Sequence, residues 1–267
     1  MNRRASRNIG SEAYPSDDKP ASIFQHYVGI TLDRTQYEFA TSRVISSGQD
    51  NGERKDFSAQ SAKPRPHTSE TIQLFCGDAA NPSSWPKELQ QAVSIAFSQE
   101  KSQYSSHAPE PERYVLALDS AYHFQPSRRP IFKYTHSVLH AHFLAFDIFL
   151  APASSSRLRS FVNNFALRVL TPSLSAPFSN FVPPSAYKTQ LRDAGYAEED
   201  IAIEDITDDV FPGLARFLER RDQQLAALGL SGFLKWRISG WLFRWLSAGD
   251  ILRAGIVVAK WKEKGLK

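Results

Sequence analysis

An apolar run that ends in a carboxylate constrains the fold of this chain more than any other feature. Residues 114–118 read Tyr-Val-Leu-Ala-Leu, Asp119 follows them, and His123 comes four residues later. A continuous apolar run predicts a strand covered on both faces, as in a parallel sheet between two layers of helices. Because such sheets bind ligands at the carboxyl ends of their strands, we expect Asp119 and His123 to lie where the chemistry takes place.

Strand and helix patterns alternate along the rest of the chain. We expect strands at residues 24–30, 72–76, 114–119, 142–150, 201–206 and 255–261, and helices at residues 33–45, 87–97, 130–140, 157–170, 185–194 and 211–246. This alternation favours an α/β fold with a Rossmann-like, doubly wound, mostly parallel sheet over a bundle or a sandwich. Asp33 is predicted to cap the first helix, and Gly195 to end the helix at residues 185–194.

The length of 267 residues allows one sizeable α/β domain with insertions. Residues 1–20 are rich in Arg, Ser, Asp and Pro and are predicted to be disordered, which places the domain at residues 21–267. The polar stretches at 48–70 and 98–112 are interpreted as insertions, and residues 211–250 as a helical insertion before the last strand.

Cysteine usage and hydropathy indicate a soluble, cytoplasmic protein. Cys76 is the only cysteine, so an intrachain disulfide is impossible and a reducing compartment fits best. Within its apolar run, Cys76 is expected to be a small buried side chain. Residues 1–20 lack the apolar core of a signal peptide, and the chain has no run of about 18 apolar residues.

The net charge of +4 is mild, but its distribution is uneven. Residues 235–267 carry eight Lys or Arg and two acidic residues, which fits a solvated helix face or a contact with an anionic surface. Residues 233–246 hold three of the five tryptophans with flanking cations, so both packing as a lid and peripheral membrane contact stay open. We expect no nucleic-acid partner, because nucleic-acid binding requires a broader basic face than this sequence offers. The oligomeric state stays open.

Several short segments occur in an order found in one enzyme family. Val-Gly-Ile-Thr-Leu-Asp-Arg-Thr-Gln at 28–36, Cys-Gly-Asp-Ala at 76–79 and Asp-Ser-Ala-Tyr-His-Phe at 119–124 are the main ones. They resemble the ends of the second, third and fourth strands of class I S-adenosylmethionine-dependent methyltransferases. The similar branch acts on small molecules and includes macrolide-sugar O-methyltransferases, tocopherol methyltransferases and cyclopropane fatty-acid synthases. Weaker matches follow at residues 144–148, 191–196, 203–206 and 254–260, and the last of these resembles the antiparallel seventh strand of the family.

The resemblance implies S-adenosylmethionine as cofactor and a small, apolar acceptor as the partner. The residues that it assigns to the cofactor are Thr31, Leu32, Asp33, Gln36, Gly77, Asp78, Ala79, Asp119 and Ser120. In the family pattern, Thr31, Leu32 and Gln36 contact the ribose and adenine, and Asp33 serves the ribose hydroxyls. Asp78 accepts a hydrogen bond from the adenine amino group.

This sequence departs from the family pattern at its first strand. That strand normally carries a Gly-rich loop whose amides approach the cofactor closely. Here Gly10 follows no apolar run, and the next glycine is Gly29. The turn before the fifth strand, usually Pro-Gly-Gly, reads Leu-His-Ala-His at 139–142. We therefore expect a sheet that is incomplete at its N-terminal strand. The alternative to an enzyme is a non-catalytic or truncated methyltransferase-fold protein that serves as a binding or scaffold module.

Three side chains are candidates for the chemistry: His123, Asp119 and Asp147. His123 could act as a general base, because histidine exchanges protons near neutral pH; its alternative role is a structural hydrogen bond. Asp119 either contacts the cofactor or acceptor, or caps the helix that follows. Asp147 lies inside an apolar strand, where an unpaired carboxylate is costly, so a polar cleft or a partner is expected, and the side chain could orient the base or acceptor.

The histidines at 136, 140 and 142 do not have the pattern of a metal site. Positions 136 and 140 share one helix face, but no carboxylate or cysteine accompanies them at ligand spacing. We interpret them as a solvated helix end and expect no metal.

Overall fold

The computed structural model describes residues 26–47, 72–98, 112–151, 176–229 and 251–263, together with residues 165, 168, 240, 241 and 243–245. The disorder predicted for residues 1–20 and nearly all of the two polar insertions lie outside the described residues. The same holds for most of the helix predicted at 157–170 and most of the Trp-rich segment at 233–246.

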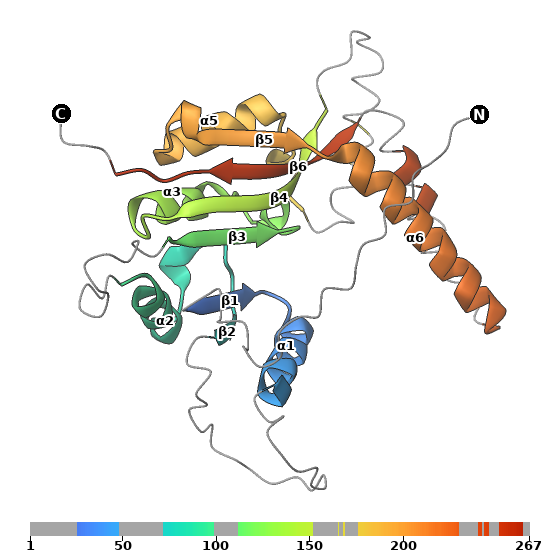
Figure 1. The fold of residues 1–267 in the computed structure, drawn as a ribbon, viewed down its shortest axis with the longest axis horizontal. Helices are drawn as coiled ribbons and strands as arrows, with labels where there is room; N and C mark the ends of the chain where they lie inside the picture. Colours follow the sequence, from blue (N-terminus) through green and yellow to red (C-terminus); the bar gives the residue numbers. More distant parts are fainter. Residues whose placement is uncertain are drawn as a thin grey trace, which may run out of the picture.

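The described residues form helices and strands in the predicted alternation (Figure 1). The elements, in chain order, are β1 (Tyr27–Thr31), α1 (Arg34–Ser47), β2 (Ile72–Cys76), α2 (Lys87–Phe97), β3 (Tyr114–Leu118), α3 (Arg129–Ser137), β4 (His142–Leu150), α5 (Pro184–Ala194), β5 (Ile201–Asp205), α6 (Thr207–Ala227) and β6 (Leu252–Ala259). Short 3-10 turns lie at Pro82–Ser84, Ala121–His123, Phe178–Asn180 and Glu198–Asp200.

The strands belong to two separate sheets. One sheet holds β1 and β2, which pair in parallel, and the other has the order β3-β4-β6-β5. In the second sheet β3 and β4 are parallel, while β6 is antiparallel to both β4 and β5. The expected α/β fold with an antiparallel last strand is confirmed. Among the described residues, no strand joins β1 to β3, and we call this separation of the two sheets the break between β1 and β3.

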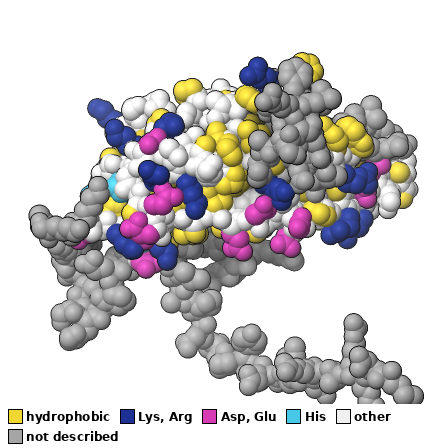
Figure 2. Space-filling view, turned by 90° about the horizontal axis from the view of Figure 1, so that it is seen from above, with side chains coloured by type: hydrophobic (Ala, Val, Ile, Leu, Met, Phe, Trp, Pro, Cys, Tyr) yellow, Lys and Arg dark blue, Asp and Glu magenta, His cyan; other side chains and the backbone are white. Residues whose placement is uncertain are grey.

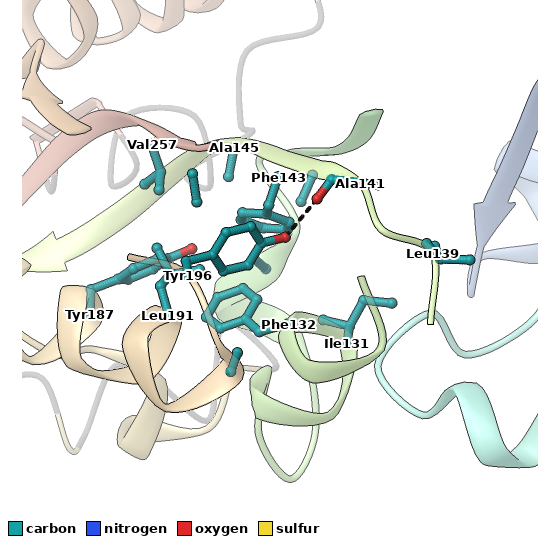
Figure 3. Packing of buried hydrophobic residues seen from close by; sticks show 14 of the residues in the cluster. Ile131, Phe132, Leu139, Ala141, Phe143, Ala145, Tyr187, Leu191, Tyr196 and Val257 are labelled. Carbon is teal, nitrogen blue, oxygen red and sulfur yellow. Dashed lines mark hydrogen bonds between the residues drawn. The ribbon is translucent and has the colours of Figure 1, made fainter. Parts of the chain in front are cut away.

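The larger of two hydrophobic clusters among the described residues joins the two sheets through one layer of helices. Alternation along β4 sends Phe143, Ala145 and Phe149 into this core. Phe132 of α3 packs against Phe143 (Figure 3), and Tyr187 of α5 packs against Phe149. Val28 and Ile30 of β1 and Val115 and Ala117 of β3 pack against the same cluster. Each fully buried Phe or Leu contributes about 1.5–3 kcal/mol, so this shared cluster fixes both sheets on one helical layer.

Local sequence explains where the helices begin and end. Asp33 caps α1, because its carboxylate accepts a hydrogen bond from the amide of Gln36 at 3.0 Å. In α5, buried side chains recur at Tyr187, Leu191 and Ala194, the spacing of one helix face. Gly195 then ends α5 with φ +122°, as expected.

The prediction that the run 114–118 is covered on both faces is wrong. Val115 and Ala117 face the core, but Tyr114, Leu116 and Leu118 are 40%, 47% and 69% exposed. The physical reason is the layer arrangement, since helices α2, α3 and α5 pack on one face and leave much of the other open. A continuous apolar run therefore shows that a strand has apolar side chains on both faces, but it does not show that both faces are buried.

Other boundaries and burial predictions also need correction. The helix predicted at 211–246 begins earlier and α6 ends at Ala227, where Leu228 and Gly229 form a turn with φ +72° at the glycine. The last strand runs over Leu252–Ala259 instead of 255–261. Cys76 is exposed and not buried, because it ends β2 on the face that the core cluster does not cover.

Among the described residues, no helix is both long enough and apolar enough to cross a membrane.

Candidate functional site

The carboxyl ends of β1, β3, β4 and β5 lie at the same side of the molecule (Figure 1). Since β2 is parallel to β1, its carboxyl end lies there as well. The residues that follow β1, β2 and β3 are those that the sequence singles out for cofactor binding. The fold therefore places the predicted site along one edge, which we call the strand-tip edge.

At the end of β1 the side chains form a local hydrogen-bonded turn. The Thr31 hydroxyl donates to Oε1 of Gln36 at 3.1 Å and accepts from the amide of Asp33 at 3.3 Å. Asp33 and Gln36 are exposed, and Leu32 is 76% exposed. The cap on α1 holds the Asp33 carboxylate in place. A carboxylate has about four lone-pair positions, so this cap leaves capacity for a further donor.

The end of β2 adjoins the end of β1 and has a similar turn. The amide of Gly77 donates to the carbonyl oxygen of Thr31 at 2.9 Å, which ties the two tips together. The Asp78 carboxylate accepts from the amide of Ala80 at 2.9 Å, and the Asp78 carbonyl accepts from Nε1 of the buried Trp85 at 2.7 Å. Asp78 and Ala79 are half-buried. This anchoring fixes where the second carboxylate points.

The end of β3 carries Asp119 in an unusual backbone conformation. Its φ of +52° is in the left-handed region, which a side chain other than glycine adopts at a cost. The Tyr122 hydroxyl donates to the Asp119 carboxylate at 2.8 Å. Ser120, and not Asp119, is the cap residue of the 3-10 turn Ala121–His123, and its side chain makes no capping bond. The structure therefore rejects the alternative that Asp119 caps the helical turn that follows it.

His123 ends the 3-10 turn next to Tyr122. It is half-buried, and its ring centroid lies 4.1 Å from that of Tyr122. Burial, and then the charge of Asp119, raise the pKa of Tyr122 above its usual range, so its hydroxyl stays protonated and keeps donating to Asp119. Asp119, Tyr122 and His123 thus form one small polar group at the tip of β3.

Asp147 lies behind this edge, inside the core. Its side chain is fully buried, and Oδ2 accepts from Nη1 of the buried Arg128 at 2.9 Å. Burial raises the pKa of Asp147, while the Arg128 guanidinium and the amide of Ile148 oppose that shift. The expected partner of the carboxylate is thus Arg128. The side-chain hydrogen bond of Asp147 to Arg128 lies inside the core, and its charge also contributes to raising the pKa of Tyr122 at the tip of β3.

Arg128 is the centre of a buried polar network that the sequence did not reveal. Its Nε donates to Oε1 of Gln190 at 3.0 Å, its Nη2 donates to the carbonyl of Asn180 at 2.5 Å, and its guanidinium lies 4.1 Å from the centre of the Tyr187 ring. Asn180 in turn donates to the carbonyls of Tyr122 and Phe124, at 3.2 and 2.7 Å. The network therefore anchors the turn that carries His123.

The histidines at 136, 140 and 142 have packing roles. His140 stacks on Trp261 at 5.1 Å, and His142 accepts from the amide of Trp261 at 3.0 Å. His136 packs edge-on against Tyr196. Within the described part of the chain, no three His, Cys, Asp or Glu side chains are grouped for a metal ion.

Charges are mixed on the face seen from the side of α5 and β5. Figure 2 shows Lys and Arg interspersed with Asp and Glu on this face. Near α5 and β5 in the chain, Arg192 pairs with Glu198 at 3.0 Å, and Lys262 pairs with Asp200 at 2.5 Å. This face therefore presents no field of one sign.

Solved structures share the fold at low sequence identity. No protein-family model matches the sequence, and no curated protein matches it. The mycolic acid cyclopropane synthase CmaA1, complexed with SAH and CTAB, aligns with a TM-score of 0.54 and 10% identity over 88% of this chain and 69% of its own. The cyclopropane synthase MmaA2 from Mycobacterium tuberculosis aligns with a TM-score of 0.50 and 13% identity over 88% of this chain and 70% of its own.

This chain has the fold of a cyclopropane synthase. The predicted resemblance is thus confirmed at the level of the fold. Identities of 10% and 13% establish the fold alone. The phosphoethanolamine N-methyltransferase 2 from Haemonchus contortus, at 15% identity, aligns over 56% of this chain and over only 33% of its own length.

Proposed function

We propose that this chain is an S-adenosylmethionine-dependent methyltransferase that acts on a small, apolar acceptor. The observation that carries the proposal is the set of anchored carboxylates at the tips of β1, β2 and β3 in a cyclopropane-synthase fold. The similar CmaA1 structure, which is complexed with SAH, supports the proposal. Open α/β sheets bind their ligands at this edge.

The chemistry of the tip side chains fits an adenosyl group. Asp33 offers carboxylate oxygens to ribose hydroxyls, and Asp78 offers them to the adenine amino group. Both carboxylates are already held by backbone amides, so they lose little freedom when a ligand binds. Thr31, Leu32, Gln36, Gly77 and Ala79 would line the same stretch of the edge.

The side chains at the tip of β3 fit the methyl-donating end of the cofactor. S-adenosylmethionine, when bound, supplies a methyl group on a positively charged sulfur. The carboxylate of Asp119, oriented by Tyr122, and the neighbouring Ser120 would face that charge. His123 would accept the proton that an oxygen or nitrogen acceptor loses during transfer. Asp147 would act indirectly, by fixing Arg128, Asn180 and through them the turn of His123.

Calorimetry with the full chain tests the proposal. S-adenosylmethionine and S-adenosylhomocysteine should both bind, and Asp33→Asn or Asp78→Asn should weaken binding about 10- to 100-fold, the value of a hydrogen bond to a charged group. The side-chain oxygen of Asn can still accept the hydrogen bond from the amide of Gln36 or Ala80, so both variants should keep the fold. Asp193→Asn, which alters an exposed ion pair on α5, is the matched control. Absence of any heat of binding would refute the proposal.

A non-catalytic binding or scaffold module is the second candidate. The break between β1 and β3 favours it, because the central part of the sheet is where the family pattern has its Gly-rich loop. A methyl transfer that His123→Ala abolishes while cofactor affinity is retained would exclude this candidate.

A further inference from the structure

Asn180 places a buried amide against the turn that carries His123. It ends the 3-10 turn Phe178–Asn180 and is 2% exposed. Its Nδ2 donates to the carbonyl oxygen of Tyr122 at 3.2 Å and to that of Phe124 at 2.7 Å. A single nitrogen atom therefore holds the residues on both sides of His123.

The chemistry of this contact requires an amide side chain. Among uncharged side chains, only those of Asn and Gln have two N–H donors on one nitrogen, whereas a hydroxyl has one donor and a carboxylate has none. A charged donor would have to lose its hydration in this buried position. Asn180 can thus pair two carbonyl oxygens at once without bringing a charge into the core.

The remaining backbone of the turn is held by local bonds. The amide of His123 donates to the carbonyl of Ser120 at 3.0 Å, and the amide of Phe124 donates to the carbonyl of Ala121 at 3.3 Å. These bonds fix the shape of the turn, since both partners belong to it. Asn180 lies 56 residues after Phe124, so its bonds fix the turn against a distant part of the chain.

The residue after Asn180 holds the ring beside His123. The ring centroid of the buried Phe181 lies 5.9 Å from that of Tyr122, and the Tyr122 ring lies 4.1 Å from that of His123. Residues 180 and 181 therefore restrain both the backbone of the turn and the aromatic neighbour of His123.

The two ends of Asn180 make separate contacts. Its backbone carbonyl accepts from Arg128, which pairs with Asp147, while its side chain makes the bonds to the turn. A substitution of the side chain keeps the backbone carbonyl that accepts from Arg128. The effect of the amide on His123 can thus be measured apart from that of the buried ion pair.

We propose that Asn180 is a positioning residue for His123, the proton acceptor of the proposed methyl transfer. This inference rests on the proposed function and adds a residue that acts without contacting the cofactor or the acceptor. General base catalysis needs the imidazole within hydrogen-bond reach of the proton that it removes. A turn held at both neighbours of His123 keeps the imidazole at one place before the acceptor binds.

Chemical modification of the full chain tests the proposal. Asn180→Asp and Asn180→Leu keep a similar side-chain volume and remove both donors. In each variant, diethyl pyrocarbonate should modify His123 at least threefold faster than in the wild type, because the half-buried ring is no longer held in place. Mass spectrometry measures the rate, with the exposed His26 as the reference in the same sample.

Two further measurements separate positioning from a general loosening of the fold. In calorimetry, S-adenosylhomocysteine should bind both variants within twofold of the wild-type affinity. Thr135→Val is the matched control, because Thr135 is fully buried and its hydroxyl has no hydrogen-bond partner among the described residues. His123 should react at the wild-type rate in this variant. Circular dichroism checks each fold, and Asn180→Leu provides the test without a buried carboxylate.

The outcomes distinguish this inference from the proposed function. An unchanged or slower reaction of His123 in the Asn180 variants would overturn the positioning role and leave the proposed function intact. The same acceleration in Thr135→Val, or a loss of S-adenosylhomocysteine affinity greater than twofold in the Asn180 variants, would also overturn it. Absence of S-adenosylhomocysteine binding to the wild-type chain would instead refute the proposed function, and the positioning role with it.

Discussion

At the residue scale, the buried pair of Arg128 and Asp147 is the feature with the largest energetic consequence. Removing one partner of a buried ion pair leaves the other charge without compensation. Arg128→Met should therefore lower the free energy of unfolding by about 3–5 kcal/mol. Arg129→Met, which breaks the exposed pair with Asp193, should cost about 1 kcal/mol or less. Urea unfolding followed by tryptophan fluorescence measures both, and equal costs would contradict the assignment.

Asp205 should give the fold a pH dependence in the acid range. Burial acts to raise its pKa, but hydrogen bonds from Thr207 and the charge of Arg253 outweigh burial and leave the pKa below its usual value. The stabilisation is thus present above about pH 3.9, the pKa of an unfolded Asp, and is lost as the pH falls through the folded pKa.

Urea midpoints measured between acid and neutral pH test this effect. Wild-type protein should exceed Asp205→Asn in stability at neutral pH, and the difference should vanish in acid. Glu204→Gln, at the neighbouring exposed position, should show a smaller difference. A gap between wild type and Asp205→Asn that persists in strong acid would contradict the assignment.

The same residues show what a sequence can and cannot tell about a site. A carboxylate within an apolar strand predicts that Asp147 has a partner, and it has one. The choice of Arg128 among 32 Lys and Arg residues depends on the packing of α3 and α5 against β4, which no local pattern encodes. Tyr122 could have been noticed, because it lies three residues after Asp119, but its hydrogen bond depends on the positive φ of Asp119.

At the scale of elements, Gly255 in β6 is required by a close approach. A Cβ there would lie 2.7 Å from the carbonyl oxygen of Glu204 and 2.9 Å from the Phe149 ring. Gly255→Ala should therefore destabilise the protein by about 1–3 kcal/mol. At Gly213 in α6 an added Cβ would meet no atom within 4 Å, so Gly213→Ala should be neutral or stabilise by up to about 1 kcal/mol. Thermal unfolding of both variants checks this, and a stabilising Gly255→Ala would contradict the packing.

Element positions follow from local sequence wherever the local signal is strong. β2, α2 and β4 have the predicted bounds, because short apolar runs and helical spacing are bounded there by Gly, Pro or polar residues. The helix predicted at 211–246 is confirmed up to Ala227 and at residues 240, 241 and 243–245, but as one continuous helix it is wrong because Leu228 and Gly229 form a turn. The exposure of one face of β3 could not be predicted, because it depends on which helices surround the strand. The residues of the strand itself do not specify those helices.

At the scale of the whole molecule, the fold separates a closed side from an open side. The helical layer of α2, α3 and α5 closes one face of both sheets over a shared core, whereas on the other face Leu116 and Leu118 of β3 are exposed.

Hydrogen exchange with and without S-adenosylhomocysteine tests the central proposal most directly, because it locates the ligand as well as detecting it. Saturating ligand should slow amide exchange at residues 31–36, 77–80 and 119–123, at the strand-tip edge. Amides at the opposite ends of the strands, such as those of Tyr114 and His142, should be unaffected. Unchanged exchange at all three tips, or protection confined to another surface, would contradict the account.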